Sequence, residues 1–191
     1  MSAEAVRRAI EAFSAEKIGP FEAAALLYAT WQTESGGVAD PPPRYEAAYD
    51  KGGRYAGGSF QPELLRTYGR EAAQSWGPFQ LMPVVAWELG FKYPPRAFLD
   101  PHLAAQVVLE YYRRRVVDRG ASTPEEAYDA YNSGTHRDRR SSAVQRNVDR
   151  FMSAWKTFYA TVKPALPAAG GALLLILAVL AVIALSRKPT R

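Results

Sequence analysis

Residues 20–37 read PFEAAALLYATWQTESGG, an apolar run that ends in a glutamate, a serine and two glycines. Pro20 and the glycines predict a helix that begins near Pro20 and ends near Glu34. Leu27, Trp31 and Glu34 follow the i, i+4, i+7 spacing, which places their side chains on one helix face. A carboxyl group on that stripe has two interpretations: a solvated acid at a frayed helix end, or a proton donor kept partly dry.

The rest of the chain also carries helical signals. Residues 36–60 are rich in Gly and Pro and predict a long loop, of a kind that tends to be functional or mobile. Residues 123–126 read TPEE, a capping box that predicts a helix start. Because no segment shows the alternation of a large sheet, we expect a mainly α fold. Five further helices are predicted over residues 3–15, 62–73, 83–89, 103–119 and 142–162.

Composition excludes several kinds of site. The chain has no cysteine, which rules out disulfides, thiolate nucleophiles and Cys-ligated zinc. Its two histidines, His102 and His136, lie far apart and lack the HExxH spacing, so neither a metal site nor a cofactor is expected. The net charge is +5, and three of the basic residues cluster in the last five positions. The remainder is close to neutral, which argues against a nucleic-acid partner.

The C-terminal part differs sharply from the rest. Residues 165–185 read ALPAAGGALLLILAVLAVIAL, without a single charge, and Lys163 and Arg187 flank them. A helix of this length spans about 31 Å and matches the hydrocarbon core of a bilayer, so we expect one transmembrane helix. The expected domains are therefore residues 1–160, a helical domain, and residues 161–191, a linker, membrane anchor and basic tail. We expect the tail on the cytoplasmic side, and the N-terminus shows no secretory signal.

Three short stretches occur in a fixed order: TESGG at 33–37, SWGPFQLMP at 75–83 and AYNSG at 130–134. Together they resemble the lytic transglycosylases with a lysozyme-like catalytic domain of the goose-type and soluble lytic transglycosylase kind, which cleave peptidoglycan glycan strands. The resemblance covers roughly residues 20–160. The matching residues are Glu34, Ser35, Ser75, Gly77, Gln80, Met82, Pro83, Tyr131, Asn132 and Gly134.

The resemblance implies a lysozyme-like helical domain with Glu34 as its catalytic residue. Two departures concern the groove: PPPRYEAAY at 41–49 lengthens the spacing between the first two motifs and resembles a segment of some phage-type relatives, and Phe79 stands where Met is common. Substrate contacts are implied for Ser35, Ser75, Gly77, Phe79, Gln80, Tyr131 and Asn132.

Cleavage of a β-1,4 glycosidic bond needs an acid that holds its proton at neutral pH, and desolvation of Glu34 on an apolar face suits this. In the family, the same glutamate then acts as base toward the C6 hydroxyl of the muramic acid residue, which leaves a 1,6-anhydro sugar. The substrate's N-acetyl group supplies the internal nucleophile, so no second carboxylate is required. A hydrolytic lysozyme would need one, and Asp40, Glu46 and Asp50 are the candidates, although Arg44 and Glu46 are also placed to form an ion pair.

These observations predict a membrane-anchored lytic transglycosylase. Its expected partners are peptidoglycan strands, a lipid bilayer, and virion membrane or capsid proteins. The absence of a signal favours the virion membrane of a phage, where local wall opening accompanies genome delivery, and the bacterial cell envelope is the alternative. The other interpretations are a hydrolytic muramidase, and a non-catalytic glycan-binding or structural membrane protein on the same scaffold.

Overall fold

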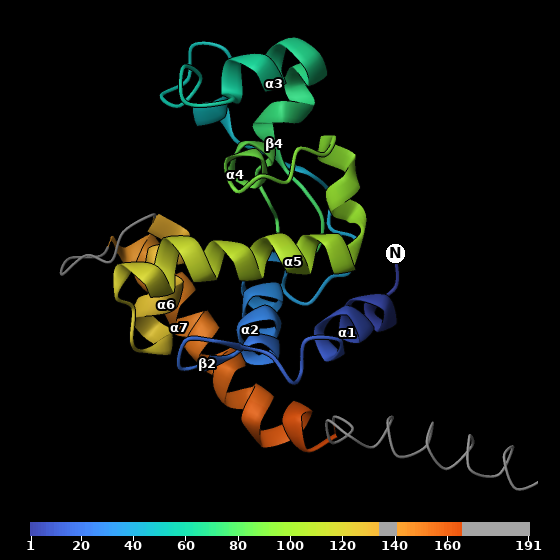
Figure 1. Ribbon diagram of the computed structural model, residues 1–191, viewed down its shortest axis with the longest axis vertical. Helices are drawn as coiled ribbons and strands as arrows, with labels where there is room; N and C mark the ends of the chain where they lie inside the picture. Colours follow the sequence, from blue (N-terminus) through green and yellow to red (C-terminus); the bar gives the residue numbers. More distant parts are fainter. Residues whose placement is uncertain (134–140, 166–191) are drawn as a thin grey trace, which may run out of the picture.

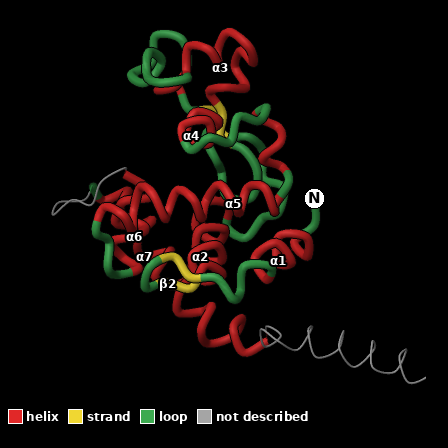
Figure 2. The backbone as a smooth tube through the Cα atoms, viewed as in Figure 1, coloured by secondary structure: helices red, strands yellow, loops and turns green. Residues whose placement is uncertain are grey.

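The computed structural model describes residues 1–133 and 141–165, and these are mainly helical, as predicted (Figures 1 and 2). Short 3-10 and π-helical turns extend several of the helices. The α-helices are α1 (Ala3–Glu11), α2 (Ala23–Ser35), α3 (Gln61–Tyr68), α4 (Pro83–Glu88), α5 (Pro101–Tyr111), α6 (Pro124–Ser133) and α7 (Ser142–Thr157).

Helix α2 forms the centre of the larger body, with α1, α5 and α7 packed around it (Figure 1). A helix that is apolar on all sides is stable only when it is surrounded, and α2 is buried almost continuously from Ala23 to Trp31. The helix ends at Gly36, which adopts a left-handed conformation with φ 64°. The predicted end of this helix is therefore confirmed, and Glu34 lies in its last turn.

The start of α2 differs from the prediction. Pro20 lies in a turn between β1 (Lys17–Ile18) and β2 (Phe21–Glu22), a short antiparallel hairpin in which Ile18 pairs with Phe21. Gly19 has φ 58°, a conformation that favours glycine and allows the tight turn. The helix consequently begins at Ala23, three residues later than Pro20.

A second pair of short strands fastens the long loop to the rest of the protein. Strand β3 (Arg44–Tyr45) is antiparallel to β4 (Gln74–Ser75), and Arg44 pairs with Ser75. This pairing brings the segment after α2 beside the SWGPFQ motif. It is a contact between distant parts of the sequence, which local patterns do not predict.

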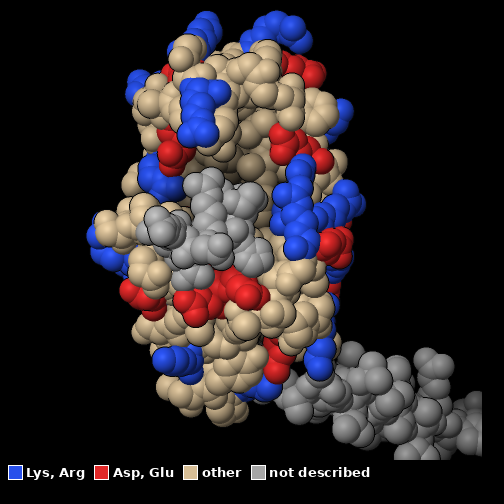
Figure 3. Space-filling view, turned by 90° about the vertical axis from the view of Figure 1, so that its left-hand side faces the viewer, with Lys and Arg blue, Asp and Glu red and all other residues tan. Residues whose placement is uncertain are grey.

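The apolar interior is divided into two clusters. The larger one surrounds α2, and the smaller one holds α3 against α4 in a separate lobe (Figure 1). In the space-filling view, charged side chains of both signs flank a hollow below this lobe (Figure 3). The buried residues of the smaller cluster are Leu64, Leu65, Ala72, Ala73, Val84 and Trp87.

Other predictions are confirmed with small changes at the ends. The helix expected over 103–119 continues past α5 as a π-helical turn, Tyr112–Val116, and a 3-10 turn, Val117–Arg119. The capping box of α6 is present: Glu126 donates its backbone N–H to Thr123 Oγ1 at 3.2 Å, and Thr123 donates its own to Glu126 Oε2 at 3.1 Å.

The segment expected to cross a membrane, residues 165–185, lies outside the described residues except for its first position. In residues 1–133 and 141–165, the helices are too short or too polar to span a bilayer. The membrane anchor therefore stays a prediction from the sequence.

Candidate active site

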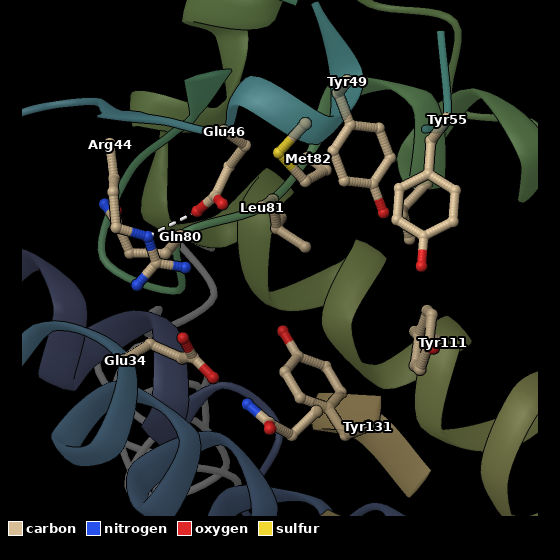
Figure 4. A pocket seen from close by; sticks show the side chains of 12 residues that line it. Glu34, Arg44, Glu46, Tyr49, Tyr55, Gln80, Leu81, Met82, Tyr111 and Tyr131 are labelled. Atoms are coloured by element: carbon tan, nitrogen blue, oxygen red, sulfur yellow. Dashed lines mark hydrogen bonds and ion pairs between the residues drawn. The ribbon is translucent and has the colours of Figure 1, made fainter. Parts of the chain in front are cut away.

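A cleft of about 470 Å³ lies between the α3 lobe and the larger body. Its floor and walls come from the end of α2, from β3 and the loop after it, from the segment after β4, and from α5 and α6 (Figure 4). The lining residues are Glu34, Arg44, Glu46, Tyr49, Tyr55, Gln80, Leu81, Met82, Val85, Tyr111, Tyr131 and Asn132.

Glu34 reaches this cleft from the last turn of α2 and is half-buried there, so its carboxyl group is partly dry and not fully solvated. Its Oε1 accepts a hydrogen bond of 2.8 Å from the hydroxyl of Tyr128 on α6. Tyr128 was not among the residues expected from the sequence, because the AYNSG motif contains Tyr131 and not Tyr128. The two tyrosines are three residues apart on one helix and therefore share a face, which is the signal that could have found Tyr128.

The surroundings of Glu34 favour its protonated form. Glu34 keeps some solvent access on the cleft side, yet burial is the largest influence and raises the pKa of its carboxyl group. The hydrogen bond from Tyr128 and the positive charge of Arg44 lower this pKa, and the negative charge of Glu46 raises it, but the net shift is upward. A carboxylic acid with a raised pKa can serve as a proton donor near neutral pH.

Stacked aromatic rings fix the position of Tyr128. Its ring stacks on Phe151 with centroids 4.5 Å apart and lies 5.9 Å from Tyr131, which stacks in turn on Tyr112 at 4.9 Å. The hydroxyl of Tyr112 is 2.8 Å from Thr30 Oγ1 on α2. Because these rings leave Tyr128 little freedom, its hydroxyl is held in place for Glu34 before any ligand binds.

Gln80 reaches the cleft from the turn after β4 and is held from both ends of its amide. Its Oε1 accepts a hydrogen bond of 3.0 Å from Ser75 Oγ, and its Nε2 donates to the Gly77 carbonyl oxygen at 3.0 Å. These bonds leave the second N–H of Gln80 for a ligand. The backbone has φ 49°, a strained conformation for a non-glycine residue that is found most often at functional sites.

Four of the predicted substrate contacts have supporting positions instead. Ser75 and Phe79 are buried, with 1% and 0% exposure, and cannot touch a sugar. Gly77 is needed for packing, since a Cβ there would lie 2.0 Å from the Phe98 carbonyl oxygen. Ser35 donates its hydroxyl to backbone carbonyl oxygens at the end of α2 and is not part of the cleft lining.

Tyr131 and Asn132 do line the cleft, together with Gln80, so three of the seven predicted contact residues lie where a ligand would bind. Gly134, the last residue of the AYNSG motif, lies outside the described residues. In the described ranges, no group of three or more acidic or histidine side chains is arranged to hold a metal ion.

Of the three candidates for a second carboxylate, only Glu46 lines the cleft. Its Oε1 accepts a hydrogen bond of 2.6 Å from Arg44 Nε, which confirms the predicted ion pair. Asp40 pairs with the N-terminal amine at 3.4 Å, and Asp50 accepts the hydroxyl of Tyr45 at 2.8 Å. Neither Asp40 nor Asp50 belongs to the cleft lining.

Tyrosines form the end of the cleft that is remote from Glu34 (Figure 4). Tyr49 and Tyr55 pack together with ring centroids 4.9 Å apart, and Tyr111 faces them from the end of α5. The loop that carries Tyr55 is tightly wound, because the Tyr55 backbone N–H donates to the Ala48 carbonyl oxygen at 2.7 Å. Local sequence patterns single out none of these rings, although the length of the loop over 36–60 is typical of functional or mobile segments.

Comparisons of the chain with protein-family models, with curated proteins and with solved structures found no match.

Proposed function

We propose that this protein is a peptidoglycan lytic transglycosylase that cleaves the β-1,4 bond after muramic acid and leaves a 1,6-anhydro product. The environment of Glu34 carries the proposal. Glu34 lies in a cleft, burial raises the pKa of its carboxyl group, and Tyr128 holds that group in place. A protein that only binds glycans has no need of a carboxylic acid whose pKa is raised by burial in its cleft.

In the first step, Glu34 donates its proton to the glycosidic oxygen, and the C1–O bond breaks with its electron pair on that oxygen. The N-acetyl oxygen of the substrate attacks C1 and forms a cyclic intermediate. The Glu34 carboxylate then takes the proton of the C6 hydroxyl, whose oxygen attacks C1 as the bond to the N-acetyl oxygen breaks. The proton taken by Glu34 restores the acid, so one carboxyl group serves both steps.

The remainder of the cleft suits an extended sugar chain. The free N–H of Gln80 is available to an acetamido oxygen, and Asn132 offers both a donor and an acceptor at the surface. The tyrosine rings at the far end supply amphipathic surfaces with hydroxyl groups at their edges. A polar end that holds the acid and an aromatic end that holds further sugar units are what a glycan strand requires.

A hydrolytic muramidase is the second candidate, because Glu46 is a carboxylate that lines the same cleft. Its product would be a reducing sugar, since water would attack C1 in place of the C6 hydroxyl. The apolar sequence over 165–185 supports a membrane-anchored form of either enzyme, in a phage virion or in the cell envelope.

The deciding experiment is digestion of purified peptidoglycan with the full-length chain in mild detergent, followed by mass spectrometry of the released fragments. Products lighter by one water molecule than reducing sugars would support the transglycosylase, and reducing products of full mass would support the muramidase. Glu34→Gln should lower cleavage at least about 100-fold while glycan binding persists. Unchanged cleavage in this variant would refute Glu34 as the general acid, and no cleavage by the wild type would refute both enzymatic proposals.

A further inference from the structure

Arg44 lies at a position in the cleft that the chemistry of Glu34 does not explain. Its guanidinium lies between the carboxyl groups of Glu34 and Glu46 in the close view (Figure 4), and all three side chains line the cleft. A cation beside an acid favours the ionised form of that acid. Arg44 alone would therefore oppose the proton donation that the proposed function requires.

Glu46 removes this conflict. It accepts Arg44 Nε at 2.6 Å and so compensates the charge of the guanidinium, while the terminal nitrogens of Arg44 remain directed toward Glu34 (Figure 4). We propose that Glu46 acts on Glu34 through Arg44, as a positioning residue that balances the charge at the acid, and that it takes no part in bond making or breaking. This inference rests on the proposed function of Glu34 as the general acid.

The fold holds the pair in a fixed place. Arg44 is paired with Ser75 across β3 and β4, and Ser75 Oγ donates to the Arg44 carbonyl oxygen at 3.4 Å. Ser75 is also the residue that holds the amide of Gln80. One buried serine thus places both Arg44 and Gln80 relative to Glu34. Through this serine, the SWGPFQ motif helps to position the charged pair beside Glu34.

The balance has a chemical purpose. Glu34 must be neutral before the glycosidic bond breaks and negative directly afterwards. An isolated arginine would favour only the second state, and an isolated Glu46 only the first. A compensated pair beside Glu34 serves both states, and the N–H groups of Arg44 stay available to the carboxylate when it forms.

The other groups around Glu34 in the described part of the chain do not provide this balance. From α6, Tyr128 and Tyr131 face it, and Tyr112 lies behind them in the π-helical turn that follows α5. Burial raises the pKa of each of these three tyrosines, so all remain neutral over the pH range of catalysis. Among the charged groups of residues 1–133 and 141–165 that act on Glu34, Arg44 and Glu46 are thus the two whose removal would change the charge in the cleft.

The test compares Glu46→Gln, Arg44→Met and the double variant by their rate of peptidoglycan cleavage against pH. Cleavage falls at high pH as Glu34 loses its proton, and this fall is the alkaline limb of the pH profile. The two single substitutions should shift the alkaline limb in opposite directions. Glu46→Gln should shift the alkaline limb to lower pH, so that the rate at a fixed pH above the limb falls about tenfold. Arg44→Met should shift the alkaline limb to higher pH, and the double variant should return the limb close to its wild-type position.

A matched control is the pair Arg96 and Glu71, which has the same 2.6 Å contact and similar exposure but does not line the cleft. Arg96→Met with Glu71→Gln should leave the limb unchanged. Abolished cleavage at every pH in both Glu46→Gln and the double variant would overturn the inference, because Glu46 would then act on the substrate. Limbs that do not move in any variant would overturn it as well.

Titration of the Glu34 carboxyl group by carbon NMR, assigned with Glu34→Gln, gives the same comparison without a substrate. Opposite displacements of this titration that cancel in the double variant support the inference even where cleavage cannot be followed. Equal titrations in all variants refute it. A wild type that titrates as inferred but releases no fragments would refute the proposed function alone.

Discussion

The hydroxyl of Tyr128 offers the sharpest test of the proposed acid. Tyr128→Phe removes one oxygen and keeps a ring that is buried and stacked on Phe151. A hydrogen bond to a charged group contributes roughly 1.5–3 kcal/mol and one to a neutral group roughly 0.5–1.5 kcal/mol. The bond to Glu34 therefore strengthens by about 1–2 kcal/mol as negative charge develops, and its loss should lower kcat about 5- to 30-fold.

The pH dependence should change as well. The bond from Tyr128 lowers the pKa of Glu34, so its removal lets the acid keep its proton to higher pH. The alkaline limb should move to higher pH even though the rate on the plateau falls. The assay is peptidoglycan cleavage at saturating substrate across the pH range, with thermal unfolding measured on the same samples.

Tyr112→Phe is the matched control, because it removes the same atom from a neighbouring buried ring whose hydroxyl contacts Thr30 instead of Glu34. It should lower stability by about 1–3 kcal/mol through the unpaired Thr30 hydroxyl, without moving the limb. A Tyr128→Phe enzyme with wild-type kcat and an unmoved limb would refute the assignment of Tyr128 to the acid.

Three further outcomes are expected. Glu34→Gln should raise the melting temperature at neutral pH, because the raised pKa makes the ionised Glu34 a cost to the folded state; the gain should vanish in calorimetry below the unfolded pKa of about 4.3, where the wild type is also neutral. Tyr55→Ala should weaken binding of β-1,4-linked N-acetylglucosamine oligomers about 5- to 20-fold by calorimetry, whereas Tyr93→Ala, outside the cleft, should not. Gly77→Ala should lower the free energy of unfolding, measured by urea denaturation, by more than about 2 kcal/mol. A near-neutral effect would contradict the close approach of the Phe98 carbonyl oxygen.

Local patterns were enough to predict the end of α2 and to place Glu34 on its apolar face, because apolar spacing identifies the buried face of a helix and a glycine pair marks its end. They left open whether the carboxyl group is solvated or partly dry, and the structure shows it half-buried in a cleft. The capping box of α6 was predictable for the same reason, since its two hydrogen bonds join residues three apart.

Contacts between distant segments were not predictable in this way. The pairing of Arg44 with Ser75 involves strands of two residues each, which leave no periodic signal. It nevertheless decides that Ser75 is a buried support and that Arg44 enters the cleft. The motif indicated Gln80 as a candidate substrate contact but not its strained backbone, because φ depends on how the turn is held by its neighbours.

The division of the interior into two apolar clusters has a consequence for local opening. The smaller cluster has few buried side chains, so the lobe with α3 should exchange its amide hydrogens through openings that leave α2 closed. The cleft is built from both units, with Glu34 on one and Tyr49 packed against the other. A sugar chain that contacts both would link the lobe to the larger body, and the lobe would no longer open independently while the glycan is bound.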